Sequence, residues 1–178
     1  MNNILKENTL KVLGIDPGST KIGYGLLSIN GKGKSTPKTN FQEELLVLGY
    51  GYLDITGFAN KGERLIQLQK DLKELFSKYK PNCIAIENIY FFKNAKTFNS
   101  VVESKGVILL TAAWARIKVF EYTPLEIKQT ITGYGKASKN LIQKLIQSSL
   151  SIKEDIKPDD ASDALAVALC HVRNLTYF

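Results

Sequence analysis

The chain has 178 residues, which is enough for one compact domain with a sizeable core and too few for two ordinary domains. Lys and Arg outnumber Asp and Glu by 24 to 17, and the net charge of +7 favours a polyanionic partner. No apolar run free of charge approaches the roughly 20 residues that cross a bilayer, so a membrane protein is not expected.

Cysteine and histidine usage limits the kinds of metal site. Cys83 and Cys170 each lie in an apolar run, and we expect both to be small buried side chains in a reducing compartment. With His171 as the single histidine, a zinc site built from Cys and His is not expected. The polar N-terminus has no signal-peptide core, which favours a cytoplasmic location.

The first part of the chain predicts three strands. Residues 11–16 form an apolar run that ends in Asp-Pro-Gly-Ser, as a buried strand closed by a turn does. Residues 22–29 and 45–55 predict the second and third strands, and the polar segment 30–43 predicts a loop between them. Successive strands with short or flexible links favour an antiparallel meander.

The pattern then changes to a helical period. Residues three or four apart predict an amphipathic helix that ends before Pro81 (Leu65, Leu68, Leu72, Leu75 and Tyr79). Residues 83–87 predict a fourth strand, and residues 97–115 a second helix. Because this helix is apolar over most of its circumference, we expect it to pack both on the sheet and on a second subunit.

The last third of the chain is mostly helical. Residues 117–122 predict a fifth strand, followed by a helical turn after Pro124, a helix capped by Ser138 and a last helix over about 159–172. This order predicts an α/β fold in which a five-stranded mixed sheet carries helices on both faces. Right-handed crossovers place the C-terminal ends of the later strands on one side, where functional groups collect in such sheets.

Four carboxylates stand where that topology can bring them together. Asp16 ends the first strand and Glu87 ends the fourth, whereas Asp160 and Asp163 share one face at the head of the last helix. Carboxylates this close repel each other unless a cation lies between them, and hard ions such as Mg²⁺ take oxygen ligands. Two such ions about 4 Å apart activate water in phosphodiester hydrolysis. The pattern therefore predicts a metal-dependent nuclease.

Each of these acids also has an ordinary explanation. An Asp before Pro-Gly, such as Asp16, is commonly a turn residue. Acids at a helix start, here Asp159 and Asp160, commonly cap the helix or interact with its dipole. Glu87 can be a lone surface acid. The combination of two strand-end acids with a helical Asp-x-x-Asp favours the metal site over these separate explanations.

Ordered motifs along the chain are similar to those of the RuvC family of Holliday junction resolvases. The match runs from about Lys11 to His171 and is carried by LGIDPGS at 13–19, GYG at 23–25, AIENIYFFKNA at 85–95, YTPLEIKQ at 122–129, GYGKA at 133–137 and DASDALA at 160–166. The resemblance implies one ribonuclease H-like nuclease domain over residues 1–178. It also implies a homodimer that makes symmetric paired nicks in four-way DNA junctions during recombination and repair.

The resemblance implies roles for individual residues. The catalytic metal ligands would be Asp16, Glu87, Asp160 and Asp163, for Mg²⁺ with Mn²⁺ as a substitute. Two ions per subunit are expected, and a single ion is the alternative that the sequence leaves open. Lys128 and Lys139 match basic positions that meet the DNA backbone, with ordinary solvated surface as the alternative. Tyr90 matches an aromatic that stacks on a crossover base, and core packing is the alternative for Tyr90, Phe91 or Phe92. A nucleoid location and a branch-migration motor as partner are implied by resemblance alone.

Two other functions stay open from the sequence. A ribonuclease H-like nuclease acting on ribosomal RNA precursors shares the first motif, but it does not explain the segments around Tyr90 and Lys128. A non-catalytic junction-binding module would have structural acids. The segment 30–43 is longer than is usual in the family, and the sequence assigns it no role.

Overall fold

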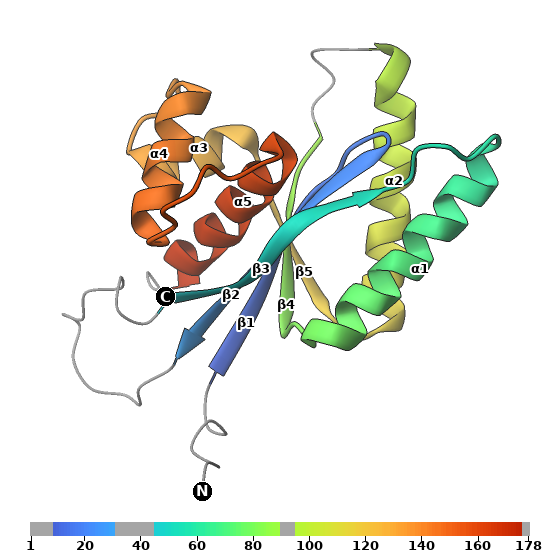
Figure 1. Ribbon diagram of the computed structural model, residues 1–178, viewed down its shortest axis with the longest axis horizontal. Coiled ribbons are helices and arrows are strands. Elements are labelled where there is room, and N and C mark those ends of the chain that lie inside the picture. The colour runs from blue at the N-terminus through green and yellow to red at the C-terminus, as the bar shows by residue number, and fades with distance from the viewer. Residues whose placement is uncertain (1–8, 31–44, 90–94, 176–178) are drawn as a thin grey trace, which may run out of the picture.

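The computed structural model of the protein describes residues 9–30, 45–89 and 95–175 and shows a twisted sheet with helices on both faces (Figure 1). Within these residues, five strands form the sheet in the order β3-β2-β1-β4-β5. They are β1 (Thr9–Asp16), β2 (Lys21–Asn30), β3 (Leu45–Asp54), β4 (Cys83–Glu87) and β5 (Lys118–Tyr122). The first three pair antiparallel, and β4 pairs in parallel with β1 and β5. The expected meander and mixed sheet are confirmed.

The helices divide between the two faces as the sequence predicts. On one side lie α1 (Lys61–Tyr79) and α2 (Ala95–Trp114). On the other side lie α3 (Pro124–Thr132), α4 (Lys139–Ser149) and α5 (Asp159–Leu175), and α5 contacts β1, β2 and β4 directly (Figure 1). No helix in the described ranges is long and apolar enough to cross a membrane.

The central strand β1 separates two apolar cores. Its successive side chains point to opposite faces, so Val12 packs into the cluster beneath α5 while Leu13 packs into the cluster beneath α1 and α2. A strand covered on both faces must be apolar at consecutive positions. This explains why the sequence shows an unbroken apolar run here.

Local signals set most helix ends. The Asn60 side chain accepts a hydrogen bond from the Glu63 N–H and begins α1, and Lys80 closes it in a left-handed conformation just before Pro81. The last helix runs on to Leu175, past the expected end near Val172. In this last turn Arg173 donates hydrogen bonds to the carbonyls of Thr130 and Ile131, a contact with α3 that the local pattern does not contain.

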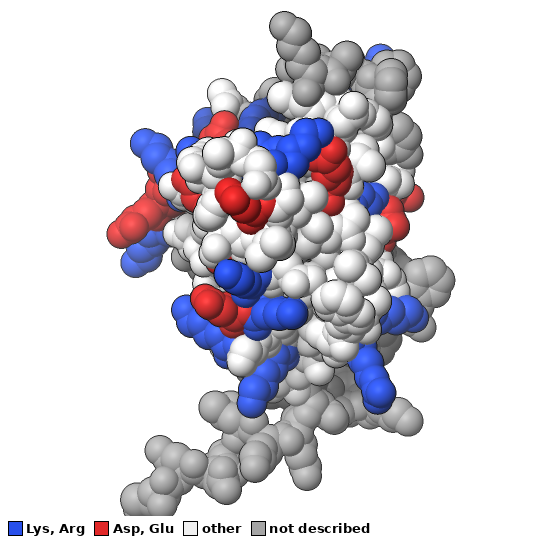
Figure 2. Space-filling view, turned by 90° about the vertical axis from the view of Figure 1, so that its right-hand side faces the viewer, with Lys and Arg blue, Asp and Glu red and all other residues white. Residues whose placement is uncertain are grey.

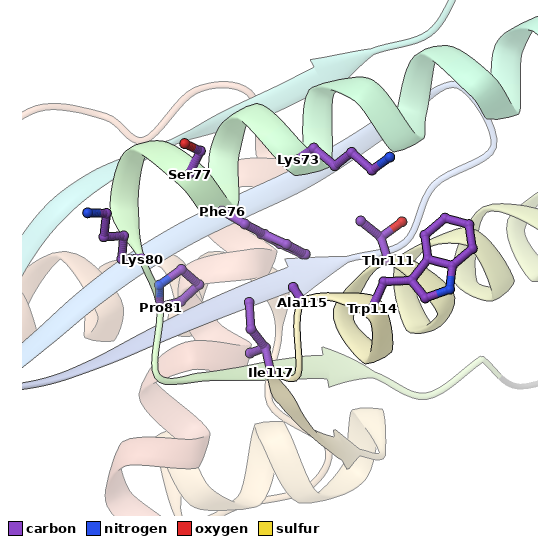
Figure 3. Close-up of a pocket in the computed structure, with 9 residues that line it drawn as sticks. All are labelled: Lys73, Phe76, Ser77, Lys80, Pro81, Thr111, Trp114, Ala115 and Ile117. Carbon is purple, nitrogen blue, oxygen red and sulfur yellow. The ribbon is translucent and has the colours of Figure 1, made fainter.

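The second apolar face expected for α2 is present. Ile108 and Ala112 are buried against the sheet, whereas Val102, Leu110 and Trp114 are 44%, 46% and 62% exposed. Uncharged surface extends over this side of the molecule between groups of charged residues (Figure 2). A groove of about 490 Å³ runs between the ends of α1 and α2 beside Trp114 (Figure 3).

The cysteines and the histidine are structural. Cys83 and Cys170 are both buried and free, as expected. The ring of His171 is buried, with its Nε2 3.4 Å from the Cys83 Sγ and its Nδ1 2.6 Å from the Tyr122 hydroxyl. These contacts tie the C-terminal half of α5 to the sheet. Residues 1–8 and 31–43 of the expected N-terminal extension and loop lie outside the described residues.

Candidate active site

Asp16 and Glu87 emerge side by side from the sheet. They are the last residues of β1 and β4, which run in parallel with Ile15 paired to Ile86. The next residue on each strand therefore leaves the sheet at the same edge. The sequence predicted both acids at strand ends, and the parallel pairing of those strands makes them neighbours.

Two glycines let α5 lie directly on the strands at this edge. A Cβ atom on Gly23 would stand 2.0 Å from the backbone oxygen of Asp160, and one on Gly14 would stand 2.0 Å from that of Ala164. No side chain fits into either gap, so both positions require glycine for a close approach of two backbones. The first turn of α5 is thereby held against the ends of β1 and β2.

Burial and mutual repulsion disfavour charge on these acids. The pKa of Asp16 rises to about 8, chiefly through burial and then through the negative charges of Glu87, Asp163 and Asp160. The pKa of Glu87 rises to about 7, through burial first and the charge of Asp163 second. Burial also raises the pKa of Asp163. At neutral pH Asp16 therefore holds a proton, and Glu87 is close to half protonated, unless a cation replaces these protons.

Lys139 brings a positive charge to the acids. Its Nζ donates to Asp163 Oδ2 at 3.0 Å and lies 3.2 Å from Asp159 Oδ2. Asp159 also accepts a hydrogen bond from Gln143 and is exposed, which agrees with a role at the helix start and not in a metal site.

The four carboxylates are the type of ligand that a hard divalent ion takes, but they do not yet surround a single point. In the described ranges, no group of three or more His, Cys, Asp or Glu side chains is placed tightly enough to hold a metal as it stands. The negative charges of Glu87, Asp163 and Asp160 nevertheless all raise the pKa of Asp16, so the four acids lie near one another. Desolvated carboxylates that repel one another supply the oxygen ligands that Mg²⁺ takes.

A cavity of about 220 Å³ opens beside the acids. Glu87 and Asp163 line it together with Lys128 and Lys139, and the rest of its wall is apolar (Pro124, Ile127, Ile142 and Ala166). Both lysines lower the pKa of Glu87. The structure thus brings the two predicted basic residues to the predicted acids. Tyr90, with Phe91 and Phe92, lies outside the described residues.

Sequence reasoning missed one contact beside the site. Lys105, in the middle of α2, donates from its Nζ to Asn88 Oδ1 at 2.9 Å and pairs with Glu121 Oε2 at 2.6 Å. The Asn88 side chain also accepts from the Ile89 N–H, so the turn directly after Glu87 is fixed on two sides. A lysine in the middle of a largely apolar helix was the available signal.

The comparison with protein families settles the relationship. The family model described as "Crossover junction endodeoxyribonuclease RuvC" matches residues 12–171. The chain belongs to the RuvC family. RuvC relatives include proteins of that same name from Caldicellulosiruptor saccharolyticus, 43% identical over 92% of each chain, and from Syntrophomonas wolfei, 42% identical over 93% of this chain and 90% of the relative.

Solved RuvC structures confirm the ribonuclease H-like fold. The Thermus thermophilus RuvC structure superimposes with a TM-score of 0.81 at 27% identity, covering 94% of this chain and 96% of the other. A structure of T. thermophilus RuvC in complex with a Holliday junction substrate gives a TM-score of 0.80 at 26% identity, with the same coverage. The family and the fold expected from the motifs are therefore both confirmed.

Proposed function

We propose that this RuvC-family chain is an endonuclease that resolves four-way DNA junctions by symmetric paired nicks. The observation that carries the proposal is the gathering of Asp16, Glu87 and Asp163 beside Lys128 and Lys139 at one edge of the sheet. A basic protein has no structural need to bury acids together. A site that binds a divalent ion and a phosphate needs both kinds of charge at one place.

The metal ligands in this proposal are Asp16, Glu87, Asp160 and Asp163, with Mg²⁺ as the ion, two per subunit, and Mn²⁺ as its substitute. The ion supplies Lewis acidity and lowers the pKa of a bound water when it is present. Asp16 and Glu87 are partly buried, so water solvates their carboxylates incompletely and a cation that binds their oxygens replaces few water contacts.

The chain's own cations complete the site. Lys128 and Lys139 line the same cavity as Glu87 and Asp163, so a phosphate that enters the cavity meets two ammonium groups beside the carboxylates. Lysines that neutralise phosphate make DNA binding weaken steeply as salt rises. The apolar wall of the cavity limits water around these charges and strengthens their interactions.

A homodimer built on α2 suits a symmetric substrate. A four-way junction offers two equivalent phosphates, and a two-fold dimer offers one site to each. The exposed face of α2, with Val102, Leu110 and Trp114, supplies the apolar surface for such an interface. In the adjoining groove, Lys73 Nζ lies 5.5 Å from the centre of the Trp114 ring (Figure 3). A Leu110→Asp variant is expected to be monomeric in analytical ultracentrifugation and to lose paired nicking.

The deciding experiment mixes the protein with a four-arm junction or a linear duplex, in Mg²⁺ or in Ca²⁺. Symmetric nicks in the junction alone, with Mg²⁺ alone, are expected. An Asp163→Asn variant is expected to bind the junction and not cut it, because it loses a ligand charge while repulsion among the acids falls. Near-normal cutting by this variant would remove Asp163 from the ligand set.

Two results would replace the proposal. Binding without cutting under every metal condition would leave a junction-binding module. Cutting of a ribosomal RNA precursor, with junctions left intact, would assign the site to RNA. The nucleoid location and the branch-migration motor stay expectations of the family resemblance, and pull-down with a purified motor complex tests the second.

A further inference from the structure

Tyr134 is an exposed aromatic on a backbone that is held in place. It lies in the turn between α3 and α4, and its side chain is 61% exposed. Its N–H donates to Thr132 Oγ1 at 3.0 Å, and its carbonyl accepts from the Ala137 N–H at 3.2 Å. Gly133, before it, closes α3 in a left-handed conformation. The turn is therefore fixed by its own hydrogen bonds and does not use the tyrosine ring for packing.

A second exposed apolar side chain lies against the same turn. Leu125, in the first turn of α3, is 59% exposed. A Cβ atom on Gly135 would stand 2.4 Å from Leu125 Cδ1. The leucine thus rests on the backbone directly after Tyr134, and glycine at 135 makes the room for it. Two large apolar groups in water at one place mark a surface that contacts a partner.

The charges around this surface select the class of partner. Leu125 follows Pro124, which lines the catalytic cavity together with Lys128 and Lys139. The carbonyl of Lys128 accepts a hydrogen bond from Thr132 Oγ1, the same hydroxyl that contacts the Tyr134 backbone. The loop that holds Tyr134 therefore begins one helical turn after Lys128. On its other side it leads through exposed Lys136 to Lys139 at the start of α4. An apolar ridge bordered by lysines fits a strand of nucleic acid.

We propose that Tyr134, supported by Leu125, is a stacking platform for a base of the junction DNA strand that enters the catalytic cavity. An aromatic face accepts any base, and lysines beside it bind the phosphates on either side of that base. A rigid backbone lowers the ordering cost of the contact. The inference rests on the proposed function, because it takes the ligand of the cavity to be DNA. It places a sequence-tolerant contact on a part of the chain other than the Tyr90 segment.

The test measures junction binding apart from cutting. Affinity is measured in Ca²⁺ for the wild type and for Tyr134→Ala, Tyr134→Phe and Tyr134→Trp, with Leu46→Ala as a control. Leu46 is 53% exposed at the start of the edge strand β3, the end of the sheet away from the acids. Stacking contributes about 1–3 kcal/mol per base, so Tyr134→Ala is expected to weaken binding roughly 5- to 150-fold. The Phe and Trp variants and the control are expected to bind as the wild type does.

A base analogue locates the contact. Junctions that carry 2-aminopurine at single positions near the crossover are expected to show one position whose fluorescence is quenched by the wild type and the Phe variant and restored with the Ala variant. Wild-type affinity in Tyr134→Ala, or equal losses in the Ala, Phe and Trp variants, would overturn the platform. If Tyr134→Ala bound a partner protein more weakly while its junction affinity stayed unchanged, the stacking platform would also be overturned.

These readouts separate the two proposals. If the wild type binds junctions and never cuts them, the nuclease proposal fails while the affinity series still tests Tyr134. If the wild type cuts and Tyr134→Ala keeps its junction affinity, the platform alone fails.

Discussion

The buried carboxylate Asp16 makes the metal-free protein less stable as the pH rises. Its pKa is about 8 in the folded protein and is near the ordinary 3.8 in the unfolded chain. The folded state thus binds this proton more tightly, so the stabilisation is fully present below about pH 4 and is lost as the pH rises through about 8. Replacement by Asn removes the charge, and Asp16→Asn is expected to be more stable than the wild type at pH 8 in EDTA.

The size of the effect follows from the pKa. Each pKa unit corresponds to about 1.4 kcal/mol, so between about pH 5 and pH 8 the upper limit for one group is about 4 kcal/mol. Asp16 shares its repulsion with Glu87, and the two titrate as a pair. We therefore expect Asp16→Asn to gain about 2–4 kcal/mol on the wild type over this interval, or roughly 5–15 °C in Tm.

The assay is thermal unfolding from pH 5 to 9 in EDTA and then in Mg²⁺. Mg²⁺ is expected to raise the wild-type Tm more at pH 8 than at pH 6, because fewer protons must leave the carboxylates for the metal to bind. It is expected to have little effect on the Tm of Asp16→Asn. Asp155→Asn, at an exposed acid, is the control. Parallel pH curves for the wild type and Asp16→Asn in EDTA would refute the repulsion among the acids on which the proposed metal site rests.

Three further variants test the surroundings of the site. Gly23→Ala is expected to push α5 from β2, since the new Cβ would meet the Asp160 carbonyl. The expected loss of unfolding free energy in denaturant is about 1–3 kcal/mol, and an unchanged midpoint would show that the helix can move freely. Lys105→Met is expected to slow single-turnover cutting on the order of tenfold without changing junction affinity, because Asn88 loses its ammonium partner. Lys105→Arg is expected to restore the rate. Loss of affinity without loss of rate would contradict this role of Lys105. Ser162→Ala is expected to stabilise the fold by about 1 kcal/mol, because the buried Ser162 hydroxyl has no hydrogen-bond partner; a lower unfolding free energy would reveal a bond to an ordered water.

Much of the fold could be predicted because its signals are local. The apolar run before Asp16, the helical spacing between Leu65 and Tyr79 and the cap at Ser138 each depend on residues a few positions apart. The acids Asp16 and Glu87 were found in the same way, since each follows directly on a buried strand. The order of the motifs that contain these acids also carried the family resemblance, which the family comparison confirmed.

Contacts between distant segments came from the tertiary structure alone. Lys139 pairs with Asp163 across 24 positions, and Lys105 reaches Asn88 across 17, so no local pattern contains either pair. The exposure of Tyr134 is of the same kind, because the sequence shows an aromatic between two glycines without showing which side of it faces water.

The sequence by itself determined the elements, the four acids and the family of this protein. Tertiary packing decided which charges meet: two glycines let α5 lie on the sheet, and that contact sets the first turn of the helix beside the ends of β1 and β4. The physical reason is the range of the interactions. Periodicity and capping act within a helical turn or a strand, whereas the pKa of Asp16 depends on burial and charges contributed by β4 and α5.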